Sequence, residues 1–464
     1  MIFLLLACTA PKEESFPTCE ITPPDGGTLV ADGSLIRDSL GRQVTLRGVN
    51  AGGRSKFAPY MPFDFDDFDS ALDDYLDRAA DWGINVLRVP FSWAALEPEP
   101  GVIDEEWAAR YDALLDGAWE RGMYTFVDAH QDIYSEAYCG DGFPLWTLVD
   151  PPEPHHDCAG WFFAYVTGDP DVQAAFDDFW ANERGTRTAF GQMWRGMAQR
   201  HRDRPGVIGY EILNEPYEGS ADHDTWAQTT LPDFYTEIAA ILNEEDPDAM
   251  VFFDSTGTDA TDATTALLAP QGERLVFAPH FYDPAVFSGA DTFTSDVDAS
   301  LGRWRDKGIE WNVPVLLGEY GADPDVGATA DYALAMQEAM DSLQLHGTWW
   351  EYSVAEESWN FEDFSIVEAD GTENAVLSAA VARPFPAAIA GTDATWAFDG
   401  ATFRMDWQAE GITELRWPTA RLGSPQLRGE GGCAAIDGTR IYIDAKGPTW
   451  IEVQVPQMVP HSEP

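Results

Sequence analysis

Short apolar, β-rich runs recur eight times along the chain, and amphipathic or loop-bounded segments separate them. They occupy residues 44–49, 85–89, 124–129, 207–213, 250–253, 275–278, 315–317 and 348–352. Strands that alternate with helices indicate a parallel sheet, and eight repeats are the number that closes a (β/α)8 TIM barrel. A doubly wound open sheet is the alternative, but no G-x-G-x-x-G sequence follows the first run, which favours the barrel.

The segments between the first runs have the spacing of amphipathic helices. Apolar residues recur at helical intervals between residues 68 and 79 and between residues 107 and 118, and Gly83 and Gly122 follow them. Glycine is a preferred residue just after a helix, so both segments are predicted to be helices. A barrel of this kind takes roughly 250 residues or more. The chain of 464 residues therefore has room for a second, smaller domain.

The pattern changes beyond Ala382 to short alternating runs bounded by turn residues, at 395–398, 403–407, 414–417, 441–444 and 450–455. This pattern predicts an all-β module. We expect a leader and linker over residues 1–22, the barrel over 23–382 and a small β-sandwich-like domain over 383–464. That last domain is interpreted as an appendage packed on the barrel, with carbohydrate or lipid binding as the alternative.

The third predicted strand is followed by a long segment, residues 131–185, rich in glycine, proline and aromatic residues. Loops of this length are usually functional or disordered. The segment contains Trp146, Trp161 and Tyr165 together with Cys139 and Cys158. A disordered segment would need no such pair of cysteines, so we expect an ordered lid at the mouth of the barrel.

The amino terminus has a short apolar run that ends in Leu-Leu-Ala-Cys at residues 5–8 and resembles a bacterial lipoprotein signal with Cys8 as the lipidated residue. The basic residues that usually begin such a signal are missing. We expect an exported protein, either secreted or a cell-envelope lipoprotein of a bacterium. A lipidated Cys8 would attach it to a membrane.

Four further cysteines, an even number, are compatible with disulfides in an exported protein. Cys139 and Cys158 lie in one loop and form the favoured pair. Cys19 and Cys433 would then join the amino-terminal arm to the carboxyl-terminal region. Free buried thiols are the alternative for all four.

The formal net charge is −53, from 80 acidic against 27 basic side chains. A polyanion of this kind is repelled by nucleic acid and by anionic membrane surfaces, so nucleic-acid binding is not expected. The Asp-rich stretch at 64–74 is interpreted as an acidic helix face, with a metal site as the weaker alternative.

Two glutamates follow predicted strands directly. Glu215 stands in Asn-Glu-Pro at the end of the fourth run, and Glu319 stands in Gly-Glu-Tyr after the seventh. Barrel enzymes place their catalytic groups at the carboxyl ends of the strands, so both carboxylates should face one mouth. Retaining glycoside hydrolysis needs such a pair roughly 5 to 5.5 Å apart, one as general acid/base and one as nucleophile.

The chain from about residue 44 to 358 resembles glycoside hydrolase family 5. Within that family, Arg-Gly-Val-Asn at 47–50, the segment 56–60, Asp-Ala-His-Gln-Asp at 128–132 and Gly-Asp-Gly-Phe-Pro-Leu-Trp at 140–146 resemble the endoglycoceramidase branch. The resemblance implies that Glu215 is the acid/base, that Glu319 is the nucleophile and that a glycolipid or related glycoside is the substrate. The segment 139–185 is larger and more acidic than in that branch.

The same resemblance implies the residues that bind the substrate. Arg88 and Tyr282 would support Glu319, with His280 close by, and Asn214 would bind the sugar 2-hydroxyl. The remaining positions line the glycan subsite or the floor under the sugar: Lys56, His130, Asp132 and Trp350. Around His130 no second histidine has ligand spacing, so we expect no metal, and no organic cofactor because side chains and water perform both steps.

Other functions stay open on sequence alone. An exo-acting β-glucosidase or steryl glucosidase, or an endo-β-glucanase, would differ only in the walls of the pocket. A non-catalytic glycan-binding barrel would lack a carboxylate, and both are present. A surface adhesin would act through the carboxyl-terminal module instead. We expect a monomer.

Overall fold

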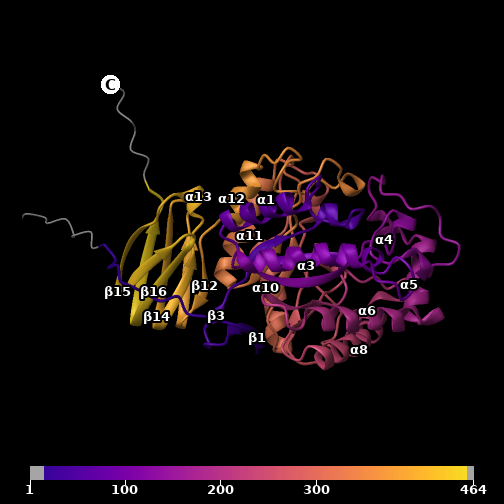
Figure 1. Cartoon of the computed structure of the whole chain (residues 1–464), viewed down its shortest axis with the longest axis horizontal. Coiled ribbons are helices and arrows are strands. Elements are labelled where there is room, and N and C mark those ends of the chain that lie inside the picture. Colours follow the sequence, from indigo (N-terminus) through magenta and orange to yellow (C-terminus); the bar gives the residue numbers. More distant parts are fainter. Residues whose placement is uncertain (1–14, 457–464) are drawn as a thin grey trace, which may run out of the picture.

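The computed structural model of the chain describes residues 15–456. Figure 1 shows a barrel ringed by helices and, beside it, a small β domain drawn in yellow. The barrel strands are β4 (Arg47–Asn50), β5 (Val86–Ser92), β6 (Tyr124–His130), β7 (Val207–Glu211), β8 (Met250–Phe253), β9 (Leu275–Phe277), β10 (Leu316–Tyr320) and β11 (His346–Trp349). They pair in parallel in the order β10-β11-β4-β5-β6-β7-β8-β9. A parallel bridge from Phe277 to Val315 closes the ring, so the predicted (β/α)8 barrel is confirmed.

The first predicted strand, residues 44–49, begins earlier than the barrel strand β4, which starts at Arg47. Val44 belongs to β3 (Gln43–Val44), which pairs with β2 (Leu35–Asp38) and with β12 (Phe385–Ile389) rather than with a barrel strand. Its side chain packs under the barrel with Leu46 and Ala388. The apolar run continues through the junction of two sheets, and hydrophobicity alone does not mark where one sheet ends.

Helices cover the outside of the barrel (Figure 1). The larger ones are α1 (Phe68–Asp81), α3 (Glu105–Glu120), α6 (Thr186–His201), α8 (Thr230–Glu245), α10 (Val297–Trp311) and α11 (Thr329–Leu343), and the shorter ones are α2 (Trp93–Leu96), α7 (His223–Gln228), α9 (Pro284–Phe287) and α12 (Ala375–Val381). The Asp104 side chain accepts hydrogen bonds from the amides of Glu106 and Trp107 and so caps α3. The two helices predicted first from sequence correspond to α1 and α3.

The long segment after β6 is ordered, but it is not all loop. It contains the 3₁₀ helices Glu136–Tyr138, Leu145–Thr147 and Glu183–Gly185, and the α-helices α4 (Phe163–Thr167) and α5 (Pro170–Trp180). Sequence analysis did not predict α5, although Asp169 caps it and Pro170 occupies its first turn, both of which are helix-start signals. The predicted disulfide between Cys139 and Cys158 is present.

The carboxyl-terminal domain is antiparallel. It consists of β12, β13 (Gly391–Phe398), β14 (Thr402–Arg416), β15 (Gln426–Asp437), β16 (Arg440–Gln454) and the turn helix α13 (Thr419–Leu422). The strand order β1-β2-β3-β12-β14-β16-β15, with β13 on β14, adds β1 (Leu29–Asp32), β2 and β3 to this sheet. The predicted domain boundaries include these three strands in the barrel, because strand pairing between distant segments leaves no local pattern in the sequence. The disulfide between Cys19 and Cys433 joins the amino-terminal arm to β15.

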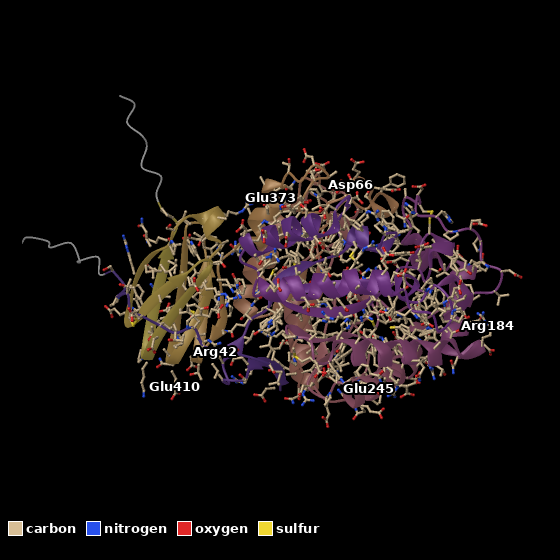
Figure 2. The ribbon with its side chains drawn as sticks, viewed as in Figure 1. Arg42, Asp66, Arg184, Glu245, Glu373 and Glu410 are labelled. Atoms are coloured by element: carbon tan, nitrogen blue, oxygen red, sulfur yellow. A yellow bond between two sulfur atoms is a disulfide. The ribbon has the colours of Figure 1, made fainter. Side chains whose placement is uncertain are left out.

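Polar contacts fix the β domain on the barrel. Asp341 of α11 accepts hydrogen bonds from Arg47 at 3.0 Å and from Trp396 of β13 at 3.1 Å. Arg416 of β14 donates to the carbonyl of Gly122, which follows α3, at 3.1 Å. Arg42, labelled in Figure 2, lies between β2 and β3 and donates to the carbonyl of Ile412 of β14 at 3.1 Å, within the sheet of the β domain. Arg47, Asp341 and Trp396 are all buried, so polar groups meet away from solvent at the junction of the two domains.

Among residues 15–456, no helix combines the length and the apolar character that a membrane crossing requires. Cys8, the predicted lipidation site, lies outside the described residues.

Candidate active site

The two predicted catalytic glutamates meet at the carboxyl end of the barrel. Glu319 lies in β10, and Glu215 lies four residues beyond the last residue of β7. One carboxylate oxygen of each residue and one ring nitrogen of His280 lie within 4.8 Å of one another. The sequence motifs at the strand ends therefore bring both carboxylates to one point.

Glu319 is held in the ionised form. Its Oε1 accepts a hydrogen bond from Arg88 Nη1 at 2.6 Å, and its Oε2 accepts one from the Tyr282 hydroxyl at 2.9 Å. Burial by itself favours the neutral acid, but the charges of His280 and Arg88 outweigh it and lower the pKa of Glu319. An ionised carboxylate with its lone pairs directed by two donors is suited to attack carbon.

Arg88 is fully buried on β5 among three carboxylates. Its guanidinium forms paired hydrogen bonds to Glu211 at 2.7 and 2.8 Å and lies 3.1 Å from Asp128 Oδ2. It also donates to Asn214 Oδ1 at 2.8 Å. The planar guanidinium of arginine can donate hydrogen bonds to all of these partners at once, and the single ammonium group of lysine cannot.

Glu215 has a different environment. Its Oε1 lies 2.7 Å from His280 Nδ1, and its side chain is 13% exposed, so one carboxylate edge stays accessible from the mouth. The backbone of Glu215 has φ 38°, an uncommon value for a residue other than glycine. Gln131 Nε2 donates to the carbonyl oxygens of Asn214 and Glu215, both at 2.9 Å, which helps to hold this conformation.

His280 connects the two glutamates, because its Nδ1 also lies 3.5 Å from Glu319 Oε2. Burial disfavours the charged ring, but Asp254 and Glu319 outweigh this effect and raise the pKa of His280 to about 10. The imidazolium therefore lies between the two carboxylates at neutral pH. The resemblance implied a histidine near the nucleophile, and the structure places its closest contact on Glu215.

Four of the glycan-binding residues predicted from sequence lie together with Glu362, which was not predicted. We call this group the Lys56 cluster: Lys56, His130, Asp132, Trp350 and Glu362. Lys56 Nζ lies 2.7 Å from Asp132, 3.5 Å from Glu362 and 4.5 Å from the centroid of the Trp350 ring. His130 stacks on Trp350 with ring centroids 5.2 Å apart. Trp350 Nε1 donates to Glu362 Oε1 at 2.7 Å.

An aromatic wall, made of Tyr282, Phe287, Phe364, Phe162 and Phe163, leads outward from the nucleophile. Phe287 packs against Tyr282 at 5.8 Å, against Phe364 at 6.1 Å and against Phe162 at 5.2 Å between ring centroids. Phe163 is 55% exposed and contacts Phe162. The site thus has a charged polar group in the Lys56 cluster and an apolar route in this wall.

Every predicted site residue lies in one of these contacts, but several residues of the site were not predicted. Asp128 and Glu211 have a signal in hindsight, because each is a carboxylate inside an apolar strand, where an unpaired charge is costly. Asp254, which lies 3.3 Å from His280 Nε2, follows β8 in the same way. Glu362 lies in an irregular loop after β11 and carries no pattern that would reveal it.

Among residues 15–456, four groups of donors are close enough to share a cation, and two of these groups lie in the site: Glu215, His280 and Glu319, and Glu211, Asp254 and His280. In both, the carboxylates already face a cationic partner, either the Arg88 guanidinium or the His280 imidazolium. A metal would have to displace these partners. That no metal takes part remains a prediction.

The closed barrel with two juxtaposed glutamates at its carboxyl end defines a glycoside hydrolase of the (β/α)8 type. The model of a single family, described as "Cellulase (glycosyl hydrolase family 5)", matches residues 38–356. This match spans more than half of the chain, and the protein belongs to glycosyl hydrolase family 5.

Several relatives are endoglycoceramidases. Endoglycoceramidase I of Rhodococcus hoagii is 30% identical over 329 residues, 64% of this chain and 64% of that protein, so the alignment covers just under two thirds of the relative's length. The endoglycoceramidase of Cyanea nozakii is 25% identical over 451 residues, 88% of this chain and 85% of that protein. The solved structure of endo-glycoceramidase II from Rhodococcus sp. with ganglioside GM3 has the same fold, with a TM-score of 0.76, 24% identity, and 91% of this chain and 100% of that chain covered.

Proposed function

We propose that this protein hydrolyses a β-glycosidic bond with retention of configuration, with Glu319 as nucleophile and Glu215 as general acid/base. The observation that carries the proposal is the carboxylate pair, because one oxygen of Glu215 and one oxygen of Glu319 lie within 4.8 Å of each other. This short separation fits retaining enzymes, whose two carboxyl groups lie roughly 5 to 5.5 Å apart so that one of them can attack the anomeric carbon directly. Inverting enzymes need a larger gap, about 6.5 to 9.5 Å.

In the first step, a Glu319 oxygen forms a bond to the anomeric carbon while Glu215 gives its proton to the departing glycosidic oxygen. In the second step, Glu215 takes a proton from water, which attacks the anomeric carbon and releases Glu319. One Asn214 amide hydrogen is used by the Gln131 carbonyl at 3.0 Å, which leaves the other free to donate to the sugar 2-hydroxyl. Side chains and water complete both steps, so the proposal includes no cofactor.

We further propose that the substrate is a glycolipid or a related amphipathic glycoside, cleaved between glycan and lipid. The names of the relatives support this substrate class. A site that combines the charged Lys56 cluster with a partly exposed aromatic wall also suits a molecule with one polar and one apolar end.

The test is hydrolysis of a glucosylceramide, a ganglioside, a steryl glucoside and cellotetraose by wild type and by Glu319→Gln. Release of an intact oligosaccharide from the ganglioside, lost in the variant, supports endo cleavage of glycolipids. Monosaccharide release confined to simple glucosides would replace this proposal with an exo-glucosidase, and cleavage confined to cellotetraose would replace it with an endo-glucanase. Glycan binding without hydrolysis of any compound would indicate a non-catalytic barrel.

The two glutamate roles are tested separately. An activated leaving group such as dinitrophenol needs no proton, so Glu215→Gln should still release it in a burst and then stall at the glycosyl-enzyme. Glu319→Gln should show no burst. NMR of the first sugar product would reject retention if the anomer had the opposite configuration.

We also propose that the protein is exported, that Cys8 is a lipid attachment site and that the protein acts as a monomer. The two disulfides support export, because such bonds persist in oxidising compartments. The mass of the mature amino terminus in wild type and in Cys8→Ser tests the attachment. Sedimentation of the purified protein tests the oligomeric state.

A further inference from the structure

Two loops that are far apart in the sequence meet beside the Lys56 cluster. One, residues 139–161, follows β6 and is closed by the Cys139–Cys158 disulfide. The other, residues 356–364, follows β11 and carries Glu362. Their point of contact is Asn360, which is only 3% exposed.

Asn360 uses both ends of its side-chain amide on the first loop. Its Nδ2 donates to the carbonyl of Cys139 at 2.6 Å, and its Oδ1 accepts from the amide of Cys158 at 3.0 Å. Its backbone amide donates to the carbonyl of His156 at 2.8 Å. One side chain thus bridges the backbones of both half-cystines, and the disulfide keeps those two backbone groups close enough for a single amide to reach.

Residues on either side of Asn360 reach Lys56. The ring of Trp359 lies 4.2 Å from Lys56 Nζ, and Glu362 lies 3.5 Å from it. The first loop contributes Trp161, whose ring packs against Trp359 at 4.9 Å and lies 5.5 Å from the same ammonium. Both loops therefore hold the Lys56 ammonium, and they are joined to each other through Asn360.

A third contact reaches Phe57, the residue that follows Lys56 in the chain. His156, within the disulfide-closed loop, stacks on Phe57 with ring centroids 4.4 Å apart. Opening the disulfide loop would free this stack together with the Trp161 contact.

We propose that Asn360 and the Cys139–Cys158 disulfide form one positioning unit that fixes the Lys56 cluster and so sets the affinity for the glycan. Within residues 15–456, none of these three residues makes a hydrogen bond or ion pair with Glu215 or Glu319. Loss of the unit therefore weakens substrate binding and leaves the chemical step largely intact. The proposal rests on the proposed function, because it assigns the Lys56 cluster to the glycan.

The first variant is Asn360→Gly. Asn360 has φ 50°, which glycine adopts without strain, so this change removes the side chain but preserves the backbone. Asn182→Gly is the matched control, because Asn182 has φ 54° and also bonds through its amide, to Thr188 on the protein surface. For a ganglioside, Asn360→Gly should raise KM about tenfold with kcat within about threefold, as expected for lost ground-state binding. Asn182→Gly should change neither value.

Reduction provides the second test. A phosphine reductant should raise the wild-type KM as Asn360→Gly does, and Cys139→Ser/Cys158→Ser should show the raised KM without reductant and no further response. The reductant also reaches the Cys19–Cys433 disulfide. The variant Cys19→Ser/Cys433→Ser should therefore still show the rise in KM when it is reduced, because its Cys139–Cys158 disulfide is intact. A dinitrophenyl monoglycoside, which offers fewer sugars for the glycan subsite than the ganglioside, should show a smaller change in KM.

Amide hydrogen exchange distinguishes failure of this inference from failure of the proposed function. Residues 356–364 should exchange faster in Asn360→Gly and in the reduced wild type than in Asn182→Gly. If the wild type hydrolyses no glycoside, the proposed function fails and exchange still decides whether the unit exists. Three results in Asn360→Gly would each overturn the inference. They are an unchanged rate of amide exchange in residues 356–364, an unchanged KM for the ganglioside, and a loss of activity that appears only in kcat.

Discussion

Arg88 Nη1 donates to Glu319 Oε1 at 2.6 Å, and this contact places the guanidinium of one barrel strand directly on the nucleophile of another. Arg88 is fully buried and also bonds Glu211 and approaches Asp128. The orientation of Glu319 therefore depends on an ion cluster that spans four barrel strands. A buried cluster of this kind is sensitive to the shape of its cation as well as to its charge.

We expect Arg88→Lys to lower kcat by about 100-fold or more, because a preorganised donor to the reacting carboxylate is lost. The free energy of unfolding should fall by about 3 kcal/mol, since buried carboxylates lose their hydrogen-bonding partner. Steady-state kinetics and denaturant unfolding measure the two effects. Arg110→Lys, in an exposed pair with Glu106, should change stability by less than about 1 kcal/mol. Full activity in Arg88→Lys would contradict the role of Arg88.

In the pH profile of kcat/KM, the fall on the acidic side, called the acidic limb, should follow the protonation of Glu319. The charges of His280 and Arg88 lower the pKa of Glu319 against the effect of burial, so the limb of the wild type should lie below 4.5, the ordinary value for glutamate. His280→Gln removes a charge 3.5 Å from Glu319 and should move the limb upward by about one pH unit. His155→Gln, at an exposed position, should leave the limb in place. A limb that does not move in His280→Gln would count against this assignment.

The free energy of unfolding should fall as the pH rises above neutrality, and the loss of the proton from His130 should contribute to this fall. Burial lowers the pKa of His130, but Asp128 outweighs this effect and raises it from 6.5 to about 10. A raised folded-state pKa means that the stabilisation is fully present below pH 6.5 and is lost as pH rises through about 10. Across this window the group should contribute a slope of about 1.4 kcal/mol per pH unit.

His130→Asn should reduce the dependence of the free energy of unfolding on pH, measured by denaturant unfolding between neutral pH and about pH 10. His201→Asn is the control, because burial lowers the pKa of His201, so His201 is neutral in both the folded and the unfolded state over this window. It should lower stability without changing the slope. An unchanged slope in His130→Asn would argue against a charged imidazole at that position.

The junction of the two domains should depend on Asp341, which accepts hydrogen bonds from Arg47 and Trp396 and lies 3.7 Å from Arg383. Asp341→Asn should lower the free energy of unfolding by about 3 kcal/mol, because the buried arginines lose their counter-charge. The residue lies near the end of α11, which leads from the carboxyl end of β10 to the amino end of the parallel strand β11, away from the mouth. Accordingly, kcat should stay close to the wild-type value.

Asp331→Asn on the same helix is the comparison, since Asp331 is exposed in the first turn of α11. Its cost should be below about 1 kcal/mol, the usual size of a helix-dipole contribution. Thermal unfolding of both variants measures the difference. If Asp341→Asn unfolded at the same temperature as Asp331→Asn, the contacts of Asp341 would not stabilise the junction.

Much of the site could be predicted because its signals are local. Glu215 and Glu319 each follow an apolar strand, and parallel strands of a closed barrel end at one mouth, so two short motifs were enough to place them together. Asn360 and Glu362 could not be predicted in this way. They lie in an irregular loop whose path is set by contacts with the disulfide-closed loop, which is distant in the sequence.

The sequence by itself determined the eight-stranded barrel, the two glutamates and the all-β character of the carboxyl-terminal domain, since hydrophobic periodicity and strand-end motifs are properties of short segments. Only the tertiary structure decided that β1, β2 and β3 complete the sheet of the carboxyl-terminal domain and that Asp128, Glu211 and Asp254 surround Arg88 and His280. Hydrogen bonds between distant strands and the charges of buried neighbours depend on which segments meet in space, and this information is not contained in any short stretch of the chain.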